Sequence, residues 1–279
     1  MKKVLLISLL MVLNLSAFSL FGNSEKELQK IAYMTELKNL IVATQKTRGL
    51  TNNYMNGNVT AMLLVYSQRK EMKKSLKALK KFSELDNSTL VLHDKLIRLN
   101  KKAFKQDSHK SFSDYTQHIN KLLSIGSKFV SSQFKDSSEL EKKAAEMMMN
   151  KILPFTENIG KIRGLGSGVV ARTYSKKSED KALQSFVNNV EKLNEEEAPS
   201  MKSLVSKYPQ YFSKDIIIQI DKISHSTQVY ISLTQLSVIG QKDITLKTNA
   251  YFGQGTELIG EALNLFNENA NAMTKEINN

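Results

Sequence analysis

The sequence predicts an all-α protein, and three observations lead to this fold class. The 279 residues contain only three prolines and twelve glycines, so few positions interrupt a regular backbone. Apolar residues recur at three- and four-residue intervals with Lys and Glu between them, which is the period of an amphipathic helix. A short motif also occurs twice, 115 residues apart. We therefore expect eight helices forming two four-helix bundles, a duplicated helical bundle.

The expected helices follow one another along the chain with turn-forming residues between them. Asn-Gly-Asn at 56–58, Asp-Asn-Ser at 86–88 and Asp-Ser-Ser at 136–138 mark breaks, as do Pro199 and Pro209. The expected helical segments are 25–56, 59–83, 88–106, 112–134, 137–175, 177–195, 213–240 and 243–275. They divide into a first bundle over 23–136 and a second over 137–279.

The N-terminus has the order of a bacterial export signal. Lys2 and Lys3 precede an apolar run over 4–21, and a polar segment follows. We expect residues 1–22 to be a signal peptide cleaved after Ser19 or Gly22, and the alternative is an uncleaved N-terminal membrane anchor. The mature protein is then periplasmic or otherwise extracytoplasmic. Because the chain has no cysteine, it forms no disulfide and carries no lipid on a cysteine.

Composition narrows the class of function. The chain carries 40 basic and 27 acidic side chains, a balance that suits nucleic acid, an anionic membrane or an anionic ligand. An exported protein does not meet nucleic acid in the cytoplasm, so export argues against nucleic acid as the partner. No nucleophile with a base and no pair of acids can be picked out, so we expect no enzyme, no catalytic residue and no cofactor. The four histidines show no helical ligand pair, so no metal site is expected.

The kind of basic residue is more informative than the total. Of the 40 basic side chains 35 are lysine, so an arginine indicates a position where a planar, always-charged fork matters. The arginines are Arg48, Arg69, Arg98, Arg163 and Arg172. We expect Arg172, nine residues after Arg163 and therefore about half a turn round the helix, to face solvent.

Arg48 lies on the core-facing stripe of the first expected helix. The stripe positions, spaced by three and four residues, are Leu37, Ile41, Thr44, Arg48, Thr51 and Met55. A buried guanidinium needs a negative or carbonyl-rich partner, and the stripe supplies no carboxylate near Arg48, which leaves Glu36, three turns away.

The fifth expected helix repeats this situation at Arg163. Residues 46–50 and 161–165 both read Lys-x-Arg-Gly-Leu, late in the first helix of each set of four. Beside the Arg163 face run Gly160, Gly164 and Gly168 at four-residue spacing. Glycine inside a helix is unfavourable by roughly 1 kcal/mol relative to alanine, so these positions have a geometric reason. They either admit a close neighbouring helix or leave a small void beside Arg163.

Two interpretations of Arg48 and Arg163 follow. In the first, each is paired internally with a carboxylate or a helix-end carbonyl and only fixes the fold. In the second, the two forks converge on a small oxyanion. The ligand-binding candidates are Arg48 and Arg163, with weaker candidates Thr44, Thr47, Thr51, Gly164, Thr227 and Tyr230, the last two from a hydroxyl row in the seventh helix.

The segment Gln45–Tyr54, Gln-Lys-Thr-Arg-Gly-Leu-Thr-Asn-Asn-Tyr, resembles the first helix of the nitrate- and nitrite-sensing domain family. Arg163-Gly164 resembles the motif of that family's other half. The resemblance spans nearly the whole mature chain. It implies a pair of four-helix bundles that binds nitrate or nitrite through arginines and is usually joined to an output domain. The chain departs from the family at Thr47, where the family has a further arginine, and in having no arginine after Arg172.

We therefore expect a stand-alone extracytoplasmic sensor-type protein that binds a small anion, nitrate or nitrite by resemblance. It would pass its signal to a separate, membrane-bound signalling partner, and a homodimer is a possible assembly. The alternative is a basic helical adaptor that docks on a protein partner or an anionic membrane surface without a small ligand. The residues do not distinguish between nitrate and nitrite.

Overall fold

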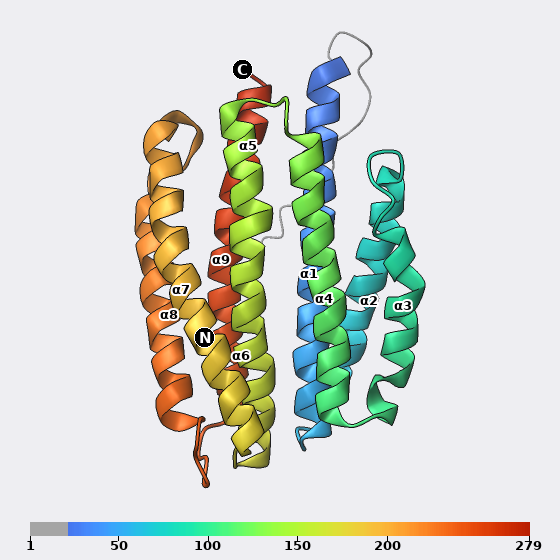
Figure 1. The fold of residues 1–279 in the computed structure, drawn as a ribbon, viewed down its shortest axis with the longest axis vertical. Helices are drawn as coiled ribbons and strands as arrows, with labels where there is room; N and C mark the ends of the chain where they lie inside the picture. Colours follow the sequence, from blue (N-terminus) through green and yellow to red (C-terminus); the bar gives the residue numbers. More distant parts are fainter. Residues whose placement is uncertain (1–21) are drawn as a thin grey trace, which may run out of the picture.

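The computed structural model describes residues 22–279, and Figure 1 shows that they form an all-α fold without a strand in that range. The first four helices are α1 (Gly22–Met55), α2 (Ala61–Leu79), α3 (Leu90–Lys102) and α4 (Ser108–Gln133). The later ones are α5 (Glu139–Glu146), α6 (Leu153–Arg172), α7 (Lys177–Lys207), α8 (Ile216–Ser237) and α9 (Thr248–Ile277). The predicted all-α fold class is confirmed.

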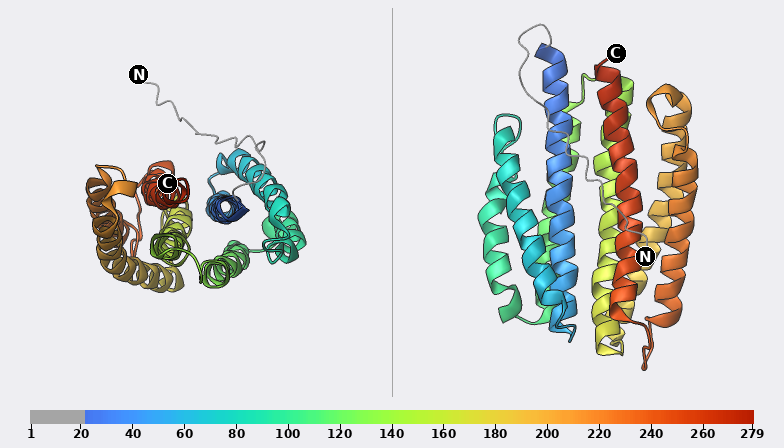
Figure 2. Two further views of the ribbon diagram at one scale, coloured as in Figure 1. Left: turned by 90° about the horizontal axis from the view of Figure 1, so that it is seen from above. Right: turned by 180° about the vertical axis from the view of Figure 1, so that it is seen from behind.

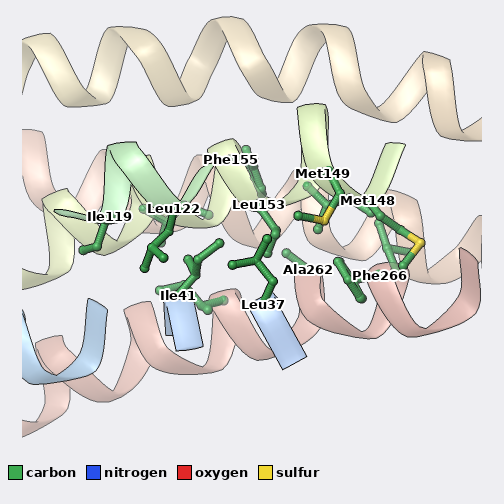
Figure 3. Packing of buried hydrophobic residues seen from close by; sticks show 14 of the residues in the cluster. Leu37, Ile41, Ile119, Leu122, Met148, Met149, Leu153, Phe155, Ala262 and Phe266 are labelled. Atoms are coloured by element: carbon green, nitrogen blue, oxygen red, sulfur yellow. The ribbon is translucent and has the colours of Figure 1, made fainter. Parts of the chain in front are cut away.

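The helices form two halves that meet along their long central members. Seen from above in Figure 2, α1, α4, α6 and α9 surround the centre, while α2 and α3 flank one side and α7 and α8 the other. The halves share one hydrophobic core. In Figure 3, Leu37 and Ile41 of α1 pack beside Leu153 and Ala262 from the second half, and all four side chains are fully buried. One hydrophobic core therefore extends across both halves.

A π-helical turn connects α5 to α6. The structure has one continuous helical stretch over 139–172, as predicted, but residues Met147–Ile152 adopt the wider π form. Pro154 follows at the start of α6. Proline has no N–H and its ring crowds the carbonyl four residues earlier, so a widened turn accommodates it. The three consecutive methionines Met147, Met148 and Met149 are buried in the core, where flexible side chains fill irregular space.

The prediction that the sixth helix ends near residue 195 is wrong. Helix α7 continues through Pro199 to Lys207, because apolar residues at helical spacing stay buried beyond the proline, among them Met201 and Leu204. Packing of these residues compensates for the hydrogen bond that proline cannot donate. The break at Pro209 is confirmed, since a short 3₁₀ turn over 209–211 follows α7.

The last helix begins five residues later than predicted. Gly240 has a positive φ of 72°, a left-handed conformation that glycine adopts without strain, and it ends the α8 region in a turn. The loop after it is tied to the end of α6, because the backbone N–H of Ile244 donates to the carbonyl of Thr173 at 2.8 Å. Helix α9 therefore begins at Thr248.

The predicted export signal over 1–22 lies, up to residue 21, outside the described residues. Within the described part of the chain, none of the helices combines the length and the apolar character that crossing a bilayer requires. The choice between a cleaved signal and an anchor therefore stays a prediction.

Helices α1 and α6 approach each other closely at two glycines. A Cβ added to Gly164 would lie 3.2 Å from the Cα of Gly49, and a Cβ on Gly49 would lie 3.4 Å from the Cα of Gly164. On the same face of α6, a Cβ on Gly160 would lie 3.2 Å from Nη2 of Arg48, and one on Gly168 would overlap the amide of Asn52. The glycine row therefore admits a close neighbouring helix, the first of the two reasons considered from the sequence.

We expect Gly164→Ala to destabilise the fold by about 1 to 3 kcal/mol, because the new methyl group meets backbone that cannot move aside easily. Gly260→Ala on α9 is the matched control, since a Cβ there has no atom within 4 Å and alanine favours the helix. Urea unfolding of both variants measures the difference. Equal stability of the two variants would show that the glycine contact is not tight.

Candidate functional site

Arg48 is fully buried on α1, in the core-facing position predicted from the helical stripe. Its guanidinium lies over the ring of Phe112, with Cζ 4.8 Å from the ring centroid. Its Nη1 donates to Oγ1 of Thr116 at 2.9 Å. Phe112 and Thr116 are one turn apart on α4, so one face of this helix supplies both an aromatic surface and a hydrogen-bond acceptor for the cation.

Arg163 is fully buried on α6 and has the same kind of support from α9. Its Cζ lies 4.7 Å from the ring centroid of Phe252, and its Nη1 donates to Oγ1 of Thr256 at 3.0 Å. Phe252 and Thr256 are again four residues apart. The two arginines therefore occupy equivalent positions, each with a phenylalanine and a threonine from the last helix of its own half.

The two arginine environments interlock into one site. A Cβ added to Gly164, the residue after Arg163, would lie 2.9 Å from Cε2 of Phe112, the ring beneath Arg48. A Cβ on Gly49, the residue after Arg48, would lie 3.1 Å from Cε2 of Phe252, the ring beneath Arg163. Each Arg-Gly pair thus makes room for the aromatic ring that supports the other arginine. This explains why glycine follows both arginines.

The two arginines differ in their charge partners. Both carboxylate oxygens of Glu157 bind Arg48, Oε1 at 2.5 Å from Nη1 and Oε2 at 3.1 Å from Nη2, and the Glu157 side chain is only 1% exposed. For Arg48 the structure therefore shows internal pairing, through a carboxylate on α6 that the spacing within α1 could not reveal. The residue 115 positions before Glu157 is Val42, so the second half receives no equivalent acid.

Arg163 has no carboxylate partner among the described residues. Its Nε and Nη2, which form one edge of the guanidinium, are buried and make no hydrogen bond there. Burial lowers the pKa of Arg163 to about 10, an effect that the nearby Arg48 reinforces and Tyr230 opposes. The side chain is still charged at neutral pH. This edge is a bidentate donor pair without an acceptor, which is the feature an oxyanion site requires.

Further polar groups near the arginines lack partners in the described part of the chain. Both side-chain amide atoms of Gln45 are buried and unbonded, as are Nε of Arg48 and the hydroxyl of Tyr230. Gly255 leaves room between Tyr230 and Arg163, because a Cβ on it would lie 2.6 Å from the tyrosine hydroxyl and 3.0 Å from Cβ of Arg163. Burial raises the pKa of Tyr230, so its hydroxyl remains a donor.

The weaker candidates fall into two groups. Thr44, Thr47 and Thr227 are buried, but each hydroxyl donates to the carbonyl four residues earlier at 2.7 to 2.8 Å. Their hydrogens are therefore used within the helices. The hydroxyl of Thr51 is buried and has no hydrogen-bond partner among residues 22–279, and the carbonyl of Gly164 accepts from Nδ2 of Asn52 at 2.9 Å.

Several residues of the site were not predicted from the sequence. They are Gln45, Phe112, Thr116, Glu157, Phe252 and Thr256. A signal for four of them was present, because Phe-x-x-x-Thr occurs at 112–116 and again at 252–256, in the last helix of each predicted set.

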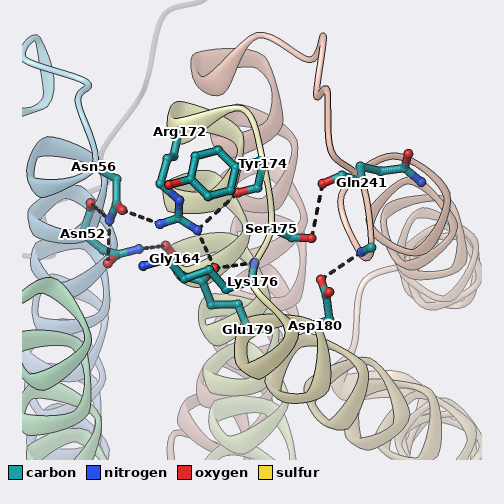
Figure 4. A network of polar contacts seen from close by, with 11 residues as sticks. Asn52, Asn56, Gly164, Arg172, Tyr174, Ser175, Lys176, Glu179, Asp180 and Gln241 are labelled. Atoms are coloured by element: carbon teal, nitrogen blue, oxygen red, sulfur yellow. Dashed lines mark hydrogen bonds and ion pairs between the residues drawn. The ribbon is translucent and has the colours of Figure 1, made fainter.

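The expectation that Arg172 faces solvent is wrong. Its side chain is only 16% exposed and forms an ion pair with Glu179 of α7. Figure 4 shows the guanidinium between this carboxylate and Asn56, the residue after the end of α1, whose Oδ1 accepts from Nη1 at 2.7 Å, beside the ring of Tyr174. Helix α6 ends at Arg172, and the residues that follow supply acceptors for its guanidinium, among them the carbonyl of Tyr174. Arg172 thus fastens α1 to the second half.

Comparisons with known proteins agree with this architecture. A family model described as nitrate and nitrite sensing matches residues 39–264. The solved structure of the NasR transcription antiterminator is similar, with a TM-score of 0.62 at 12% sequence identity. The similarity covers 91% of this chain and 70% of that one, and at this identity it shows a common fold. Among curated proteins, no sequence matches this chain.

Proposed function

Since this chain belongs to the nitrate and nitrite sensing family, we propose that it binds nitrate or nitrite between Arg48 and Arg163. The observation that carries the proposal is the buried Nε–Nη2 edge of Arg163, which has no hydrogen-bond partner among the described residues and lies near a second buried arginine. A buried donor without an acceptor is unfavourable, by roughly 1 to 3 kcal/mol for each group. A bound oxyanion removes this penalty and is therefore favoured by the site itself.

Nitrate and nitrite match this edge chemically. Two oxygens of either planar anion can accept from the parallel Nε–H and Nη2–H bonds of Arg163, as a carboxylate does in a bidentate pair. The nearby hydroxyl of Tyr230 and amide of Gln45 are additional donors without partners among the described residues. The rings of Phe112 and Phe252 keep the two cations in place and limit the access of water.

The sensing role follows from the position of the site. Arg48 belongs to the first half and Arg163 to the second, so an anion held by both would change how the halves pack. We place the protein outside the cytoplasmic membrane, where a separate membrane-bound partner reads this change. The apolar run near the N-terminus supports that location. Intact mass of the native protein tests it, since a secreted chain would lack the first 19 or 22 residues.

Arg163→Lys is expected to weaken nitrate and nitrite binding by something on the order of 1 to 3 kcal/mol, because a point donor replaces the fork while the charge is kept. Isothermal titration calorimetry at constant ionic strength measures the change. Arg98→Lys is the matched control, because Arg98 is exposed on α3 and should leave affinity unchanged. Equal affinity of the wild type and Arg163→Lys for both anions would place the binding site elsewhere.

A basic adaptor is the second candidate, and one observation favours it. Between residues 57 and 107, which include α2 and α3, twelve basic side chains stand against five acidic ones, whereas α7 and α8 over 177–237 carry seven and eight. Of these two sides, the one formed by α2 and α3 is therefore the better suited to an acidic partner or an anionic membrane. Docking of this kind weakens steeply with added salt, while a buried anion site is screened much less.

A further inference from the structure

We infer that Glu157 makes the arginine site selective for monovalent over divalent oxyanions. The inference rests on the proposed function, because it concerns which anion the same site accepts. The environments of Arg48 and Arg163 are otherwise equivalent, but they differ in charge.

Each arginine is supported by one phenylalanine and one threonine, but within residues 22–279 only Arg48 has a carboxylate partner. Glu157 binds Arg48 through both oxygens, and the equivalent position beside the other arginine is Val42. The fully buried charged groups at this site are therefore two cations, Arg48 and Arg163, and one anion, Glu157. Together they give the site a net charge of +1. Lys46 lies near Arg163, and Lys161 lies near Glu157 and Arg48, but both lysines are partly exposed, so solvent and counterions screen their charges in part.

A net charge of +1 is balanced by one nitrate or nitrite ion. A divalent anion such as sulfate would leave one negative charge uncompensated in a buried site, and such a charge is strongly unfavourable. Without the carboxylate of Glu157 the site would carry +2, and sulfate would be the balanced ligand. A single acid thus reverses which class of anion the site prefers.

The geometry acts in the same direction. Glu157 occupies the Nη1–Nη2 edge of Arg48, so the ligand finds one free bidentate edge, that of Arg163, and the single Nε of Arg48. One edge is sufficient for a planar anion. A tetrahedral anion presents oxygens in four directions and requires donors around it. Because Glu157 binds Nη1 and Nη2 of Arg48, these donors are not free to bind the further oxygens of a sulfate ion.

The test compares potassium nitrate and potassium nitrite with sodium sulfate by calorimetry at constant ionic strength, on the wild type, Glu157→Gln and Glu157→Asp. The wild type is expected to bind nitrate and to bind sulfate at least about tenfold more weakly. Glu157→Gln removes the charge and should shift the ratio of the two affinities toward sulfate by about tenfold or more. Glu157→Asp keeps the charge and should keep the preference for nitrate.

Val42→Glu provides a second variant that does not disturb the existing ion pair, in case Glu157→Gln does not fold. It places a carboxylate at the equivalent position of the first half, lowers the net charge to zero and should abolish nitrate binding. Two outcomes overturn the inference alone, provided that the wild type binds nitrate. In one, Glu157→Gln leaves the ratio of nitrate to sulfate affinity unchanged. In the other, Val42→Glu leaves nitrate affinity unchanged. A wild type that binds neither nitrate nor nitrite overturns the proposed function as well.

Discussion

Replacing Arg48 by methionine is expected to lower the free energy of unfolding by about 3 to 5 kcal/mol, whereas Arg163→Met should leave the ligand-free protein as stable as the wild type or more stable. The difference arises because Arg48→Met strands the buried carboxylate of Glu157, while Arg163 has no carboxylate to strand. Methionine keeps roughly the length of the stem in both variants. Urea unfolding without added anion measures both free energies.

A double variant separates the charge effect from packing. Arg48→Met combined with Glu157→Gln removes both charges and should recover a large part of the lost stability, since the pair is then replaced by uncharged groups. Either single arginine variant should also lose the stabilisation that nitrate gives the wild type in thermal melts. Equal losses of stability in Arg48→Met and Arg163→Met would mean that Arg163 is also paired internally, and the anion site should then be abandoned.

The second large effect concerns pH and lies away from the arginines. Glu197 of α7 is 6% exposed, and neither carboxylate oxygen has a hydrogen-bond partner in the described part of the chain. It lines a cavity of about 10 Å³, room for one water molecule, beside Asn194, Met201 and Leu265. Burial raises the pKa of Glu197 to about 8, and the positive charge of Lys151 only partly opposes this.

The stability of the protein should therefore fall as the solution becomes more alkaline. A raised pKa means that the folded state holds the proton more tightly, so the full contribution is present below the ordinary pKa of about 4.5 and is lost up to pH 8. The loss should be about 1 kcal/mol per pH unit in this window. Melting temperatures between pH 5 and pH 9 measure it.

Glu197→Gln supplies the control for this pH dependence. The amide has the shape of the protonated acid but does not ionise, so the variant should match the wild type near pH 5 and melt at a higher temperature near pH 9. Glu191→Gln, an exposed position on the same helix, should change neither value. Parallel pH profiles for the wild type and Glu197→Gln would show that Glu197 is ionised, or solvated, in the folded protein.

Local periodicity correctly predicted that one stripe of α1 and one row of α6 point inward. The stripe through Leu37, Ile41 and Arg48 and the glycine row of α6 depend only on residues within one helix, and the structure places both in the interior. Periodicity could not reveal Glu157 as the partner of Arg48, because the contact joins residues 109 positions apart and depends on how α1 and α6 align. For the same reason, periodicity could not show that the rings of Phe112 and Phe252 contact the two arginines.

Helix ends were harder to predict where tertiary packing overrides local preference. Pro199 is a strong local signal for a break, yet buried residues on both sides of it keep α7 helical. Pro154 is followed by helix as predicted, but the π turn before it, over 147–152, is visible only in the structure. The orientation of Arg172 depended in turn on Asn56 and on residues beyond the end of its own helix.

The interlocked Arg-Gly pairs link anion affinity to the docking of the two halves. Each phenylalanine that supports one arginine also fills the space beside the glycine that follows the other, so neither half alone contains a complete site. Binding free energy and docking free energy are then reciprocal. An anion that tightens the contact of α1 with α6 makes the halves harder to separate. Any protein that pulls them apart must lower anion affinity by the same factor.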